Sequence, residues 1–301
     1  MLAFHTLDVF TDTAFTGNPL AVVLGADALT TAQMQIIARE FNLSETIFVQ
    51  APAQPGHRAR VRIFLPGAEI PFAGHPTLGC AILLAEEDHP AGDFDTVLVL
   101  EEEAGLVPVR VTRRGDVTEA EFTAPVLPHA FAGSAPPALV AKALDLAEDE
   151  VGFGAHRPAL WQGGPAFLFV PVADLDCLAR ARPMEPHWSA LRAAAGVDSA
   201  YLYTPGTDCD FRARLYWPGA GVSEDPATGS ASAILAAQLQ ASGDLTPGTH
   251  RFHLRQGIEM GRPSDLRLTI EVGADGPTAI RIGGQAVRIS QGKIRVPTKP
   301  L

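Results

Sequence analysis

Short runs of apolar and β-branched residues, bounded by turn residues, recur along most of the chain. Runs of this length are typical of strands that are buried on one or both faces. We predict strands at residues 6–10, 21–25, 46–50, 96–102, 106–112, 167–172, 200–204, 267–272 and 293–297. Two other segments, 78–84 and 233–239, are apolar nearly all round at helical spacing. A helix of that kind has to be enclosed by other elements.

The chain also repeats itself. When Arg62 is aligned with Arg214, 152 positions later, "RARVRIFLPGAEI" (58–70) matches "DFRARLYWPGAGV" (210–222). Both segments predict a strand that ends in a Pro-Gly turn. A loop of small residues and an apolar helix follow each turn, now offset by 155. The matched pairs are Arg60 with Arg212, Arg62 with Arg214, Pro66 with Pro218, Gly67 with Gly219, Ala68 with Ala220 and Ile70 with Val222.

The repeat predicts an α/β (α+β) fold of two pseudo-symmetric halves. We expect each half to be a curved, mostly antiparallel sheet wrapped around its central helix. The N-terminal half spans 1–125 and is completed by a C-terminal strand at about 285–301, and the C-terminal half spans 126–284. Two such halves are expected to enclose a cleft, with both helix N-termini facing it. Helix N-termini carry unpaired N–H groups, so the cleft would suit a small anion.

Composition narrows the classes of function. A net charge of −11 over 301 residues argues against a general nucleic-acid binder, which needs a basic surface. The N-terminus lacks the pattern of a secretory signal, and no apolar run reaches the length of a membrane span. The three cysteines, Cys80, Cys177 and Cys209, form no Cys-x-x-Cys pair. We therefore expect a soluble, cytoplasmic protein with reduced cysteines.

Metal and nucleotide sites are not supported. The nine histidines are scattered, and His250 and His253 lack a third ligand nearby. The loop "PATGSAS" has no lysine of the kind a phosphate-binding loop requires, and no strand precedes a Gly-x-Gly-x-x-Gly pattern. We expect neither a metal nor a cofactor.

Three residues are candidates for proton transfer, which needs a group near the substrate that both gives and takes a proton. Glu45 opens a predicted strand among apolar neighbours, where burial raises a carboxyl pKa, although it is also placed to cap or pair locally. His75 lies in the loop before the first apolar helix, as a donor to substrate or as a structural turn residue. Asp225 precedes Pro226 ahead of the second helix, as an acid, an orienting group or a helix N-cap.

The segments "DVFTDTAFTGNPLAVVL", "REFNLSETIFV", "PFAGHPTLG", "EDPATGSA" and "QGIEMGRPS" resemble the PhzF-like phenazine biosynthesis family, in the family's order. The resemblance implies the diaminopimelate epimerase-like fold, in which two similar halves hold the active site between them. It also implies that Glu45 is the proton shuttle, assisted by His75 and Asp225. The two cysteines that diaminopimelate epimerases use are missing from the matching loops, 73–76 and 228–231, which argues against two-thiol racemisation.

The same resemblance implies a cofactor-independent isomerase that moves a proton on a small carboxylate substrate. Two alternatives are an amino- or hydroxy-acid epimerase or racemase without catalytic thiols, and a non-catalytic small-molecule binding protein. The resemblance further implies a homodimer, and the net charge and the lack of a long apolar run lead us to expect binding to neither nucleic acid nor membranes. The residues expected to bind the substrate are Asn18, Gly74, Thr228, Gly229 and Ser230.

Overall fold

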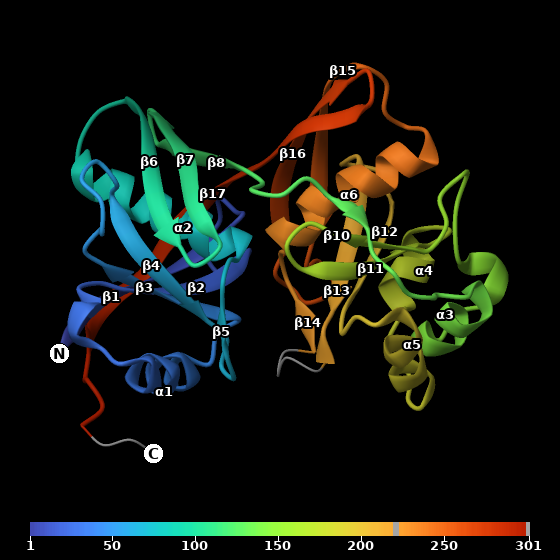
Figure 1. The fold of residues 1–301 in the computed structure, drawn as a ribbon, viewed down its shortest axis with the longest axis horizontal. Coiled ribbons are helices and arrows are strands. Elements are labelled where there is room, and N and C mark those ends of the chain that lie inside the picture. Colours follow the sequence, from blue (N-terminus) through green and yellow to red (C-terminus); the bar gives the residue numbers. More distant parts are fainter. Residues whose placement is uncertain (219–222, 299–301) are drawn as a thin grey trace. The chain divides into compact units, whose positions relative to one another are not determined.

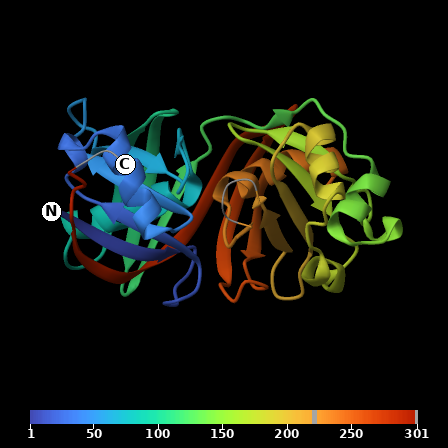
Figure 2. The same ribbon diagram turned by 90° about the horizontal axis from the view of Figure 1, so that it is seen from below.

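The computed structural model describes residues 1–218 and 223–298. Contacts divide the chain into two compact units (Figures 1 and 2). Unit 1 comprises Met1–Thr123 and Gly283–Leu301, and unit 2 comprises Ala124–Ile282. Three residues of the internal repeat, Gly219, Ala220 and Val222, lie outside the described residues.

Unit 1 is built from strands around one central helix, α2, with a second helix, α1, and a short 3-10 helix, η1, beside them. Its elements are β1 (Leu2–Val9), β2 (Asn18–Val23), η1 (Ala26–Ala28), α1 (Thr31–Phe41), β3 (Glu45–Gln50), β4 (Ala59–Phe64), β5 (Glu69–Ile70), α2 (Gly74–Asp88), β6 (Phe94–Glu102), β7 (Gly105–Arg114), β8 (Val117–Thr123) and the C-terminal part of β17 (Gly276–Ile294).

The sheet of unit 1 closes on itself. Its strands pair in the order β1-β2-β3-β4-β6-β7-β8-β17, and β17 pairs again with β1, as Figure 2 shows for the dark red and dark blue strands. The pairs β2–β3 and β4–β6 are parallel, and the pairs β1–β17, β1–β2, β3–β4, β6–β7 and β7–β8 are antiparallel. Helix α2 lies among these strands (Figure 1), and every residue from Gly74 to Ala85 is buried. The weak amphipathicity of this segment in the sequence reflects this enclosure.

Helix α2 packs unusually close to β1 and β2 at Gly79. A Cβ atom at this position would lie 2.7 Å from side-chain carbons of Leu20 and of Val9. Such a contact is far inside the usual separation of two carbons. The glycine therefore sets how closely the helix approaches the strands that carry the N-terminal candidate residues.

Unit 2 has a similar sheet and central helix, α6, with three additional helices. Its elements are β9 (His129–Ala130), α3 (Pro137–Leu144), η2 (Glu148–Glu150), β10 (Ala159–Gln162), β11 (Ala166–Pro171), α4 (Leu175–Arg180), α5 (His187–Ala195), β12 (Ala200–Pro205), β13 (Phe211–Tyr216), β14 (Glu224–Asp225), α6 (Gly229–Ser242), β15 (Gly248–Gln256), β16 (Ser264–Gly273) and the start of β17.

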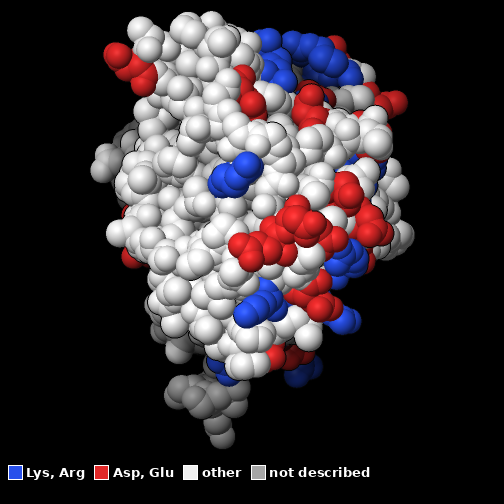
Figure 3. Space-filling model, turned by 90° about the vertical axis from the view of Figure 1, so that its right-hand side faces the viewer, with Lys and Arg blue, Asp and Glu red and all other residues white. Residues whose placement is uncertain are grey.

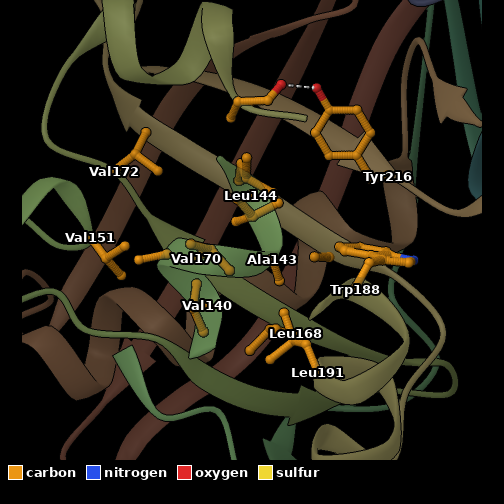
Figure 4. Packing of buried hydrophobic residues seen from close by; sticks show 14 of the residues in the cluster. Val140, Ala143, Leu144, Val151, Leu168, Val170, Val172, Trp188, Leu191 and Tyr216 are labelled. Carbon is orange, nitrogen blue, oxygen red and sulfur yellow. Dashed lines mark hydrogen bonds between the residues drawn. The ribbon is translucent and has the colours of Figure 1, made fainter. Parts of the chain in front are cut away.

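A hydrophobic cluster in unit 2 packs α3, α4 and α5 against the sheet. Figure 4 shows side chains of α3 and α5 meeting those of β11, with Trp188 and Leu191 on α5 among them. The Tyr216 hydroxyl lies at the edge of this cluster and donates to the Ala181 carbonyl at 2.6 Å. Buried tyrosines are stabilised when the hydroxyl finds such a partner. Helix α6 packs separately, on β10, β11 and β16.

The two halves of the internal repeat have matching local structure, which confirms the predicted fold class. In both, a strand turns back into a two-residue strand: β4 pairs with β5 and β13 with β14. An arginine on the first strand binds a glutamate on the second through two hydrogen bonds, Arg62 to Glu69 and Arg214 to Glu224. The central helices then begin at Gly74 and Gly229, 155 residues apart.

Candidate functional site

In unit 1 the ends of three elements bring Glu45 and His75 together. Strand β3 begins at Glu45, and its parallel pairing with β2 places Glu45 opposite Leu20. His75 is the second residue of α2, which the contact at Gly79 holds close to β2. His75 Nε2 lies 3.5 Å from Glu45 Oε2. The sequence-predicted pair is therefore assembled in the structure.

This pair is largely withdrawn from solvent. The exposed fraction of the side chain is 4% for His75 and 12% for Glu45. Burial lowers the pKa of His75 to about 3, since an uncompensated charge is costly in an apolar environment. The imidazole is therefore neutral near pH 7.

The hydrogen bonds of His75 fix its tautomer. The ring bonds the backbone of Pro19, and a proline has no N–H, so the ring must donate to the Pro19 carbonyl. Because Nε2 makes no hydrogen bond in the structure, the donor is Nδ1–H. Nε2 of the neutral ring then carries a lone pair and faces the Glu45 carboxyl group. A proton on this carboxyl oxygen would face the ring nitrogen.

Asn18 opens β2 beside this pair and is fully buried. A tight loop leads into it, in which the Phe15 N–H donates to Asp8 Oδ2 at 2.6 Å. Gly17 has φ +68°, and a Cβ there would lie 2.5 Å from the Val9 carbonyl oxygen, so only glycine fits. The loop thus holds Asn18 next to Pro19, the residue that orients His75.

In unit 2 the loop before α6 holds the other candidates. The Thr228 hydroxyl donates to Asp225 Oδ2 at 2.5 Å. Thr228, rather than Asp225, is the N-cap residue of α6, so the interpretation of Asp225 as the helix cap was wrong. Gly229 and Ser230 form the first helical positions. Neither α6 nor α2 has an acidic residue in its first turn, so the positive end of each helix dipole is retained for an anion.

Gln256 anchors this loop, although sequence reasoning did not single it out. Its Oε1 accepts from the Thr228 N–H at 3.1 Å, and its Nε2 donates to the Asp225 carbonyl at 2.7 Å and to Thr228 Oγ1 at 3.0 Å. Gln256 is completely buried. The available signal was its position at the start of the motif "QGIEMGRPS".

The cysteines are unsuited to nucleophilic work. All three are free thiols, and Cys80 and Cys177 are buried. Burial raises the pKa of Cys80, and raises that of Cys177 and of Cys209 to about 11. Because the thiolate is the reactive form, none of the three is activated near pH 7.

Within residues 1–218 and 223–298, no group of three or more His, Cys, Asp or Glu side chains is arranged to hold a metal ion. No helix in the described part of the chain is long and apolar enough to cross a membrane. The face of the molecule in Figure 3 carries a band of acidic side chains with basic ones scattered among them, rather than a continuous basic surface.

Comparison with known proteins places the chain in a family. The model of the family described as phenazine biosynthesis-like protein matches residues 7–292. An uncharacterized isomerase from Mesorhizobium japonicum is 43% identical over 95% of this chain and 96% of that protein. The trans-2,3-dihydro-3-hydroxyanthranilate isomerase of Pseudomonas aeruginosa is 35% identical over 97% of this chain and 99% of that protein.

The fold agrees with these matches. The solved structure of a predicted epimerase from Pseudomonas aeruginosa is similar with a TM-score of 0.80 and 33% identity, covering 98% of this chain and 99% of that one. Similarity over nearly the whole chain, in both sequence and fold, extends across both loops that open the central helices. This chain therefore belongs to the phenazine biosynthesis-like protein family and is an isomerase.

Proposed function

We propose that this isomerase moves a proton on a small carboxylate substrate and that Glu45 carries the proton. The observation that supports this role most directly is the buried contact between Glu45 Oε2 and His75 Nε2. A carboxylate in this position takes a proton from a carbon next to an electron-withdrawing group and returns it to another carbon. General acid/base catalysis needs such a group within reach of substrate and able to exist in both protonation states.

His75 assists Glu45 through its neutral ring. With Nδ1–H committed to Pro19, the lone pair on Nε2 faces the proton that Glu45 gains, accepts a hydrogen bond from it and holds the carboxyl group in one orientation. A ring that stays uncharged also adds no competing positive charge that would lower the basicity of the carboxylate. His75 is thus an orienting partner rather than the primary base.

The start of each central helix offers groups that suit the carboxylate of the substrate. Gly74 of α2 and Gly229 of α6 supply backbone N–H groups, and Ser230 supplies a hydroxyl as well. Asn18 contributes to the same binding, and Asp225, oriented by Thr228, stabilises charge that develops during proton transfer. The inclusion of both loops in one function is supported by the family match, which spans them both.

The relatives suggest a specific probe. Several are named trans-2,3-dihydro-3-hydroxyanthranilate isomerase, and we propose this compound or a similar cyclic amino acid as the substrate. Steady-state turnover of this compound by the wild-type enzyme is the first measurement. Failure of the wild-type enzyme to consume it would reject that substrate.

Glu45→Gln tests the role of the carboxylate, since it keeps the shape and removes the acid/base group. We expect turnover to fall by about 100-fold to 10,000-fold, as is typical for loss of a general acid/base, with an unchanged unfolding temperature. Glu40→Gln, at an exposed position on α1, is the matched control and keeps wild-type turnover. Near-normal turnover in Glu45→Gln would refute the assignment.

Epimerisation is the second candidate, because a structural relative with 33% identity is named a predicted epimerase. The two reactions differ in where hydrogen from solvent appears. In deuterium oxide, isomerisation yields a product with a shifted double bond and deuterium at a new carbon, whereas epimerisation yields deuterium at one inverted stereocentre. NMR of the product separates the two outcomes.

We also propose that the protein is a homodimer located in the cytoplasm, on the strength of the family resemblance. Light scattering coupled to size-exclusion chromatography checks the oligomer: the dimer predicts twice the chain mass of 31.8 kDa. A mass of one chain at micromolar concentration would reject the dimer.

A further inference from the structure

Glu102, the last residue of β6, carries a buried carboxyl group that the proposed mechanism does not use. Its exposed fraction is 8%. Its Oε1 lies 2.6 Å from Thr77 Oγ1, and Thr77 Oγ1 lies 2.7 Å from the Ala73 carbonyl oxygen. The other carboxyl oxygen, Oε2, has no hydrogen-bond partner in the described structure. Ala73 is the N-cap of α2, two residues before His75.

The number of protons in this arrangement determines the charge of Glu102. The Thr77 hydroxyl has one proton, so it donates to only one of its two oxygen neighbours. If it donates to the Ala73 carbonyl, as the 2.7 Å distance indicates, Glu102 must supply the proton for the other contact. A protonated Glu102 donates to Thr77, and Thr77 donates to Ala73. Burying Oε2 without a hydrogen bond carries a smaller free-energy penalty when the carboxyl group is neutral than when it is a carboxylate.

The internal repeat gives independent support. The parallel pairing of β4 with β6 places Ala59 opposite Leu100, and that of β13 with β15 places Phe211 opposite Leu254. Ala59 and Phe211 are themselves equivalent in the repeat, 152 residues apart.

Leu100 on β6 and Leu254 on β15 are therefore equivalent positions. Glu102 and Gln256 each lie two residues after these leucines, so Glu102 is the counterpart of Gln256. Gln256 uses its neutral amide to hold the loop before α6.

We propose that Glu102 is a positioning residue that acts as a neutral acid: through Thr77 it holds the Ala73 carbonyl at the start of α2, as the Gln256 amide holds the start of α6. By fixing this loop it fixes His75 relative to Glu45, so its effect on catalysis rests on the function proposed above. The protonated carboxyl group takes the place of an amide, and loss of its proton breaks the chain of hydrogen bonds.

The surroundings of Glu102 favour the neutral form. Burial raises the pKa of Glu102 to about 8, with the Thr77 hydrogen bond opposing this rise. From α2, Thr77 and Cys80 face it, and Gly105 lies opposite on β7. Arg58, a cation before β4 that acts on Cys80, is committed to Asp88 by two hydrogen bonds of 2.6 and 2.9 Å.

Charges close to Cys80 complete the surroundings. Glu87, on the same helix, adds a second negative charge there, as its effect on the Cys80 pKa shows.

The pH dependence of stability tests this proposal without relying on activity. A carboxyl group whose pKa is about 8 in the folded protein, against 4.5 when unfolded, contributes stability below about pH 4.5 that is lost as the pH rises through 8. Glu102→Gln keeps a donor to Thr77 and removes the titration. We expect the difference in unfolding temperature, Glu102→Gln minus wild type, to increase steadily from pH 4.5 to about pH 8 and then to stay constant.

Measurements of activity test whether Glu102 positions the loop before α2. We expect the kcat of the wild-type enzyme to fall above pH 8, and Glu102→Gln to keep wild-type kcat at neutral pH and to show no such fall. Glu102→Ala removes the hydrogen-bond chain, and a loop displaced by about 1 Å costs on the order of 100-fold in kcat. Gln256→Glu is the reciprocal variant: it is expected to acquire a loss of stability with rising pH, because its carboxylate would face the Asp225 carbonyl.

These experiments distinguish the proposed function of Glu45 from the proposed role of Glu102. A Glu102→Gln protein whose unfolding temperature changes with pH as the wild type does would overturn the neutral-acid assignment, whatever the activity. Equal kcat in Glu102→Gln and Glu102→Ala would overturn the positioning role. If Glu45→Gln keeps its turnover while Glu102→Gln shows the expected stability profile, the proposed function fails and the neutral acid stands.

Discussion

At the scale of single residues, burial controls which groups of the candidate site are charged. His75 is kept neutral by its enclosure, which outweighs the opposing effect of its bond to Pro19, so Nε2 offers a lone pair to Glu45. In unit 2 the Asp225 side chain is held by the Thr228 hydroxyl, whose oxygen in turn accepts from Gln256. Each functional side chain is oriented by a neighbour whose own hydrogen bonds are fixed.

Thr228 offers a residue-scale prediction. Thr228→Val removes the hydroxyl while keeping the shape, which leaves the Asp225 oxygen and the Gln256 amide without this partner. Hydrogen bonds to charged groups contribute about 1.5–3 kcal/mol, so we expect kcat/KM to fall by about 10-fold to 100-fold. Thr228→Ser restores the hydroxyl and is expected to recover most of the loss in steady-state assays. A valine variant as active as the serine variant would show that this bond does not orient Asp225.

At the scale of elements, the central helices and most core strands were predictable, because continuous apolar runs and the strand-turn-helix repeat are local signals. The predicted segment 293–297 was wrong beyond Ile294, where β17 ends. The C-terminal strand expected at about 285–301 overlaps the second part of β17, a 19-residue strand, whereas the first part, from Gly276, was missed because polar residues and glycines interrupt its pattern. Helices α3, α4 and α5 were missed as well, since they are short, six to nine residues each.

The site was predictable only in part for a related reason. Glu45, His75 and Asp225 lie in recognisable motifs, whereas the partners that orient them are distant in sequence. Gln256 lies 31 residues from Asp225, and Glu102 lies 25 residues from Thr77. Such contacts depend on the register of paired strands, which periodicity alone does not give.

Helix α2 provides the element-scale prediction. Gly79→Ala gains up to about 1 kcal/mol of helix propensity but adds a Cβ 2.7 Å from Leu20 and Val9, and overpacking of a filled core costs about 1–3 kcal/mol. We expect a net loss of stability and a lower kcat, because the helix that carries His75 must shift. Gly67→Ala, where nothing lies within 4 Å of the added Cβ, is the control for urea unfolding and for activity. A Gly79→Ala protein at least as stable as the control would contradict the close packing.

At the scale of the whole molecule, the chain is two copies of one arrangement: a sheet curved around a helix that begins with a small-residue loop. We propose that the two units correspond to the two halves of the internal repeat. Unit 2 is continuous in sequence and has its own hydrophobic cluster around α3, α4 and α5. A segment with a separate core is able to fold alone.

We therefore expect a fragment that contains residues 124–282 to fold by itself. Circular dichroism should show a single cooperative thermal transition, at a temperature below that of the full chain because β17 is cut at Ile282. The absence of a cooperative transition in the fragment would mean that the units are not independent folding units.

The central claim is that Glu45 itself carries the proton, and single turnover in deuterium oxide tests it most directly. With enzyme in excess over trans-2,3-dihydro-3-hydroxyanthranilate, the wild-type protein is expected to form product in which the newly protonated carbon carries deuterium to the extent that the proton held by Glu45 exchanges with solvent before its return. Glu45→Gln should bind the compound with a similar dissociation constant, measured by calorimetry, and place none there in the same time. Deuterium incorporation by Glu45→Gln at the wild-type rate would contradict the account.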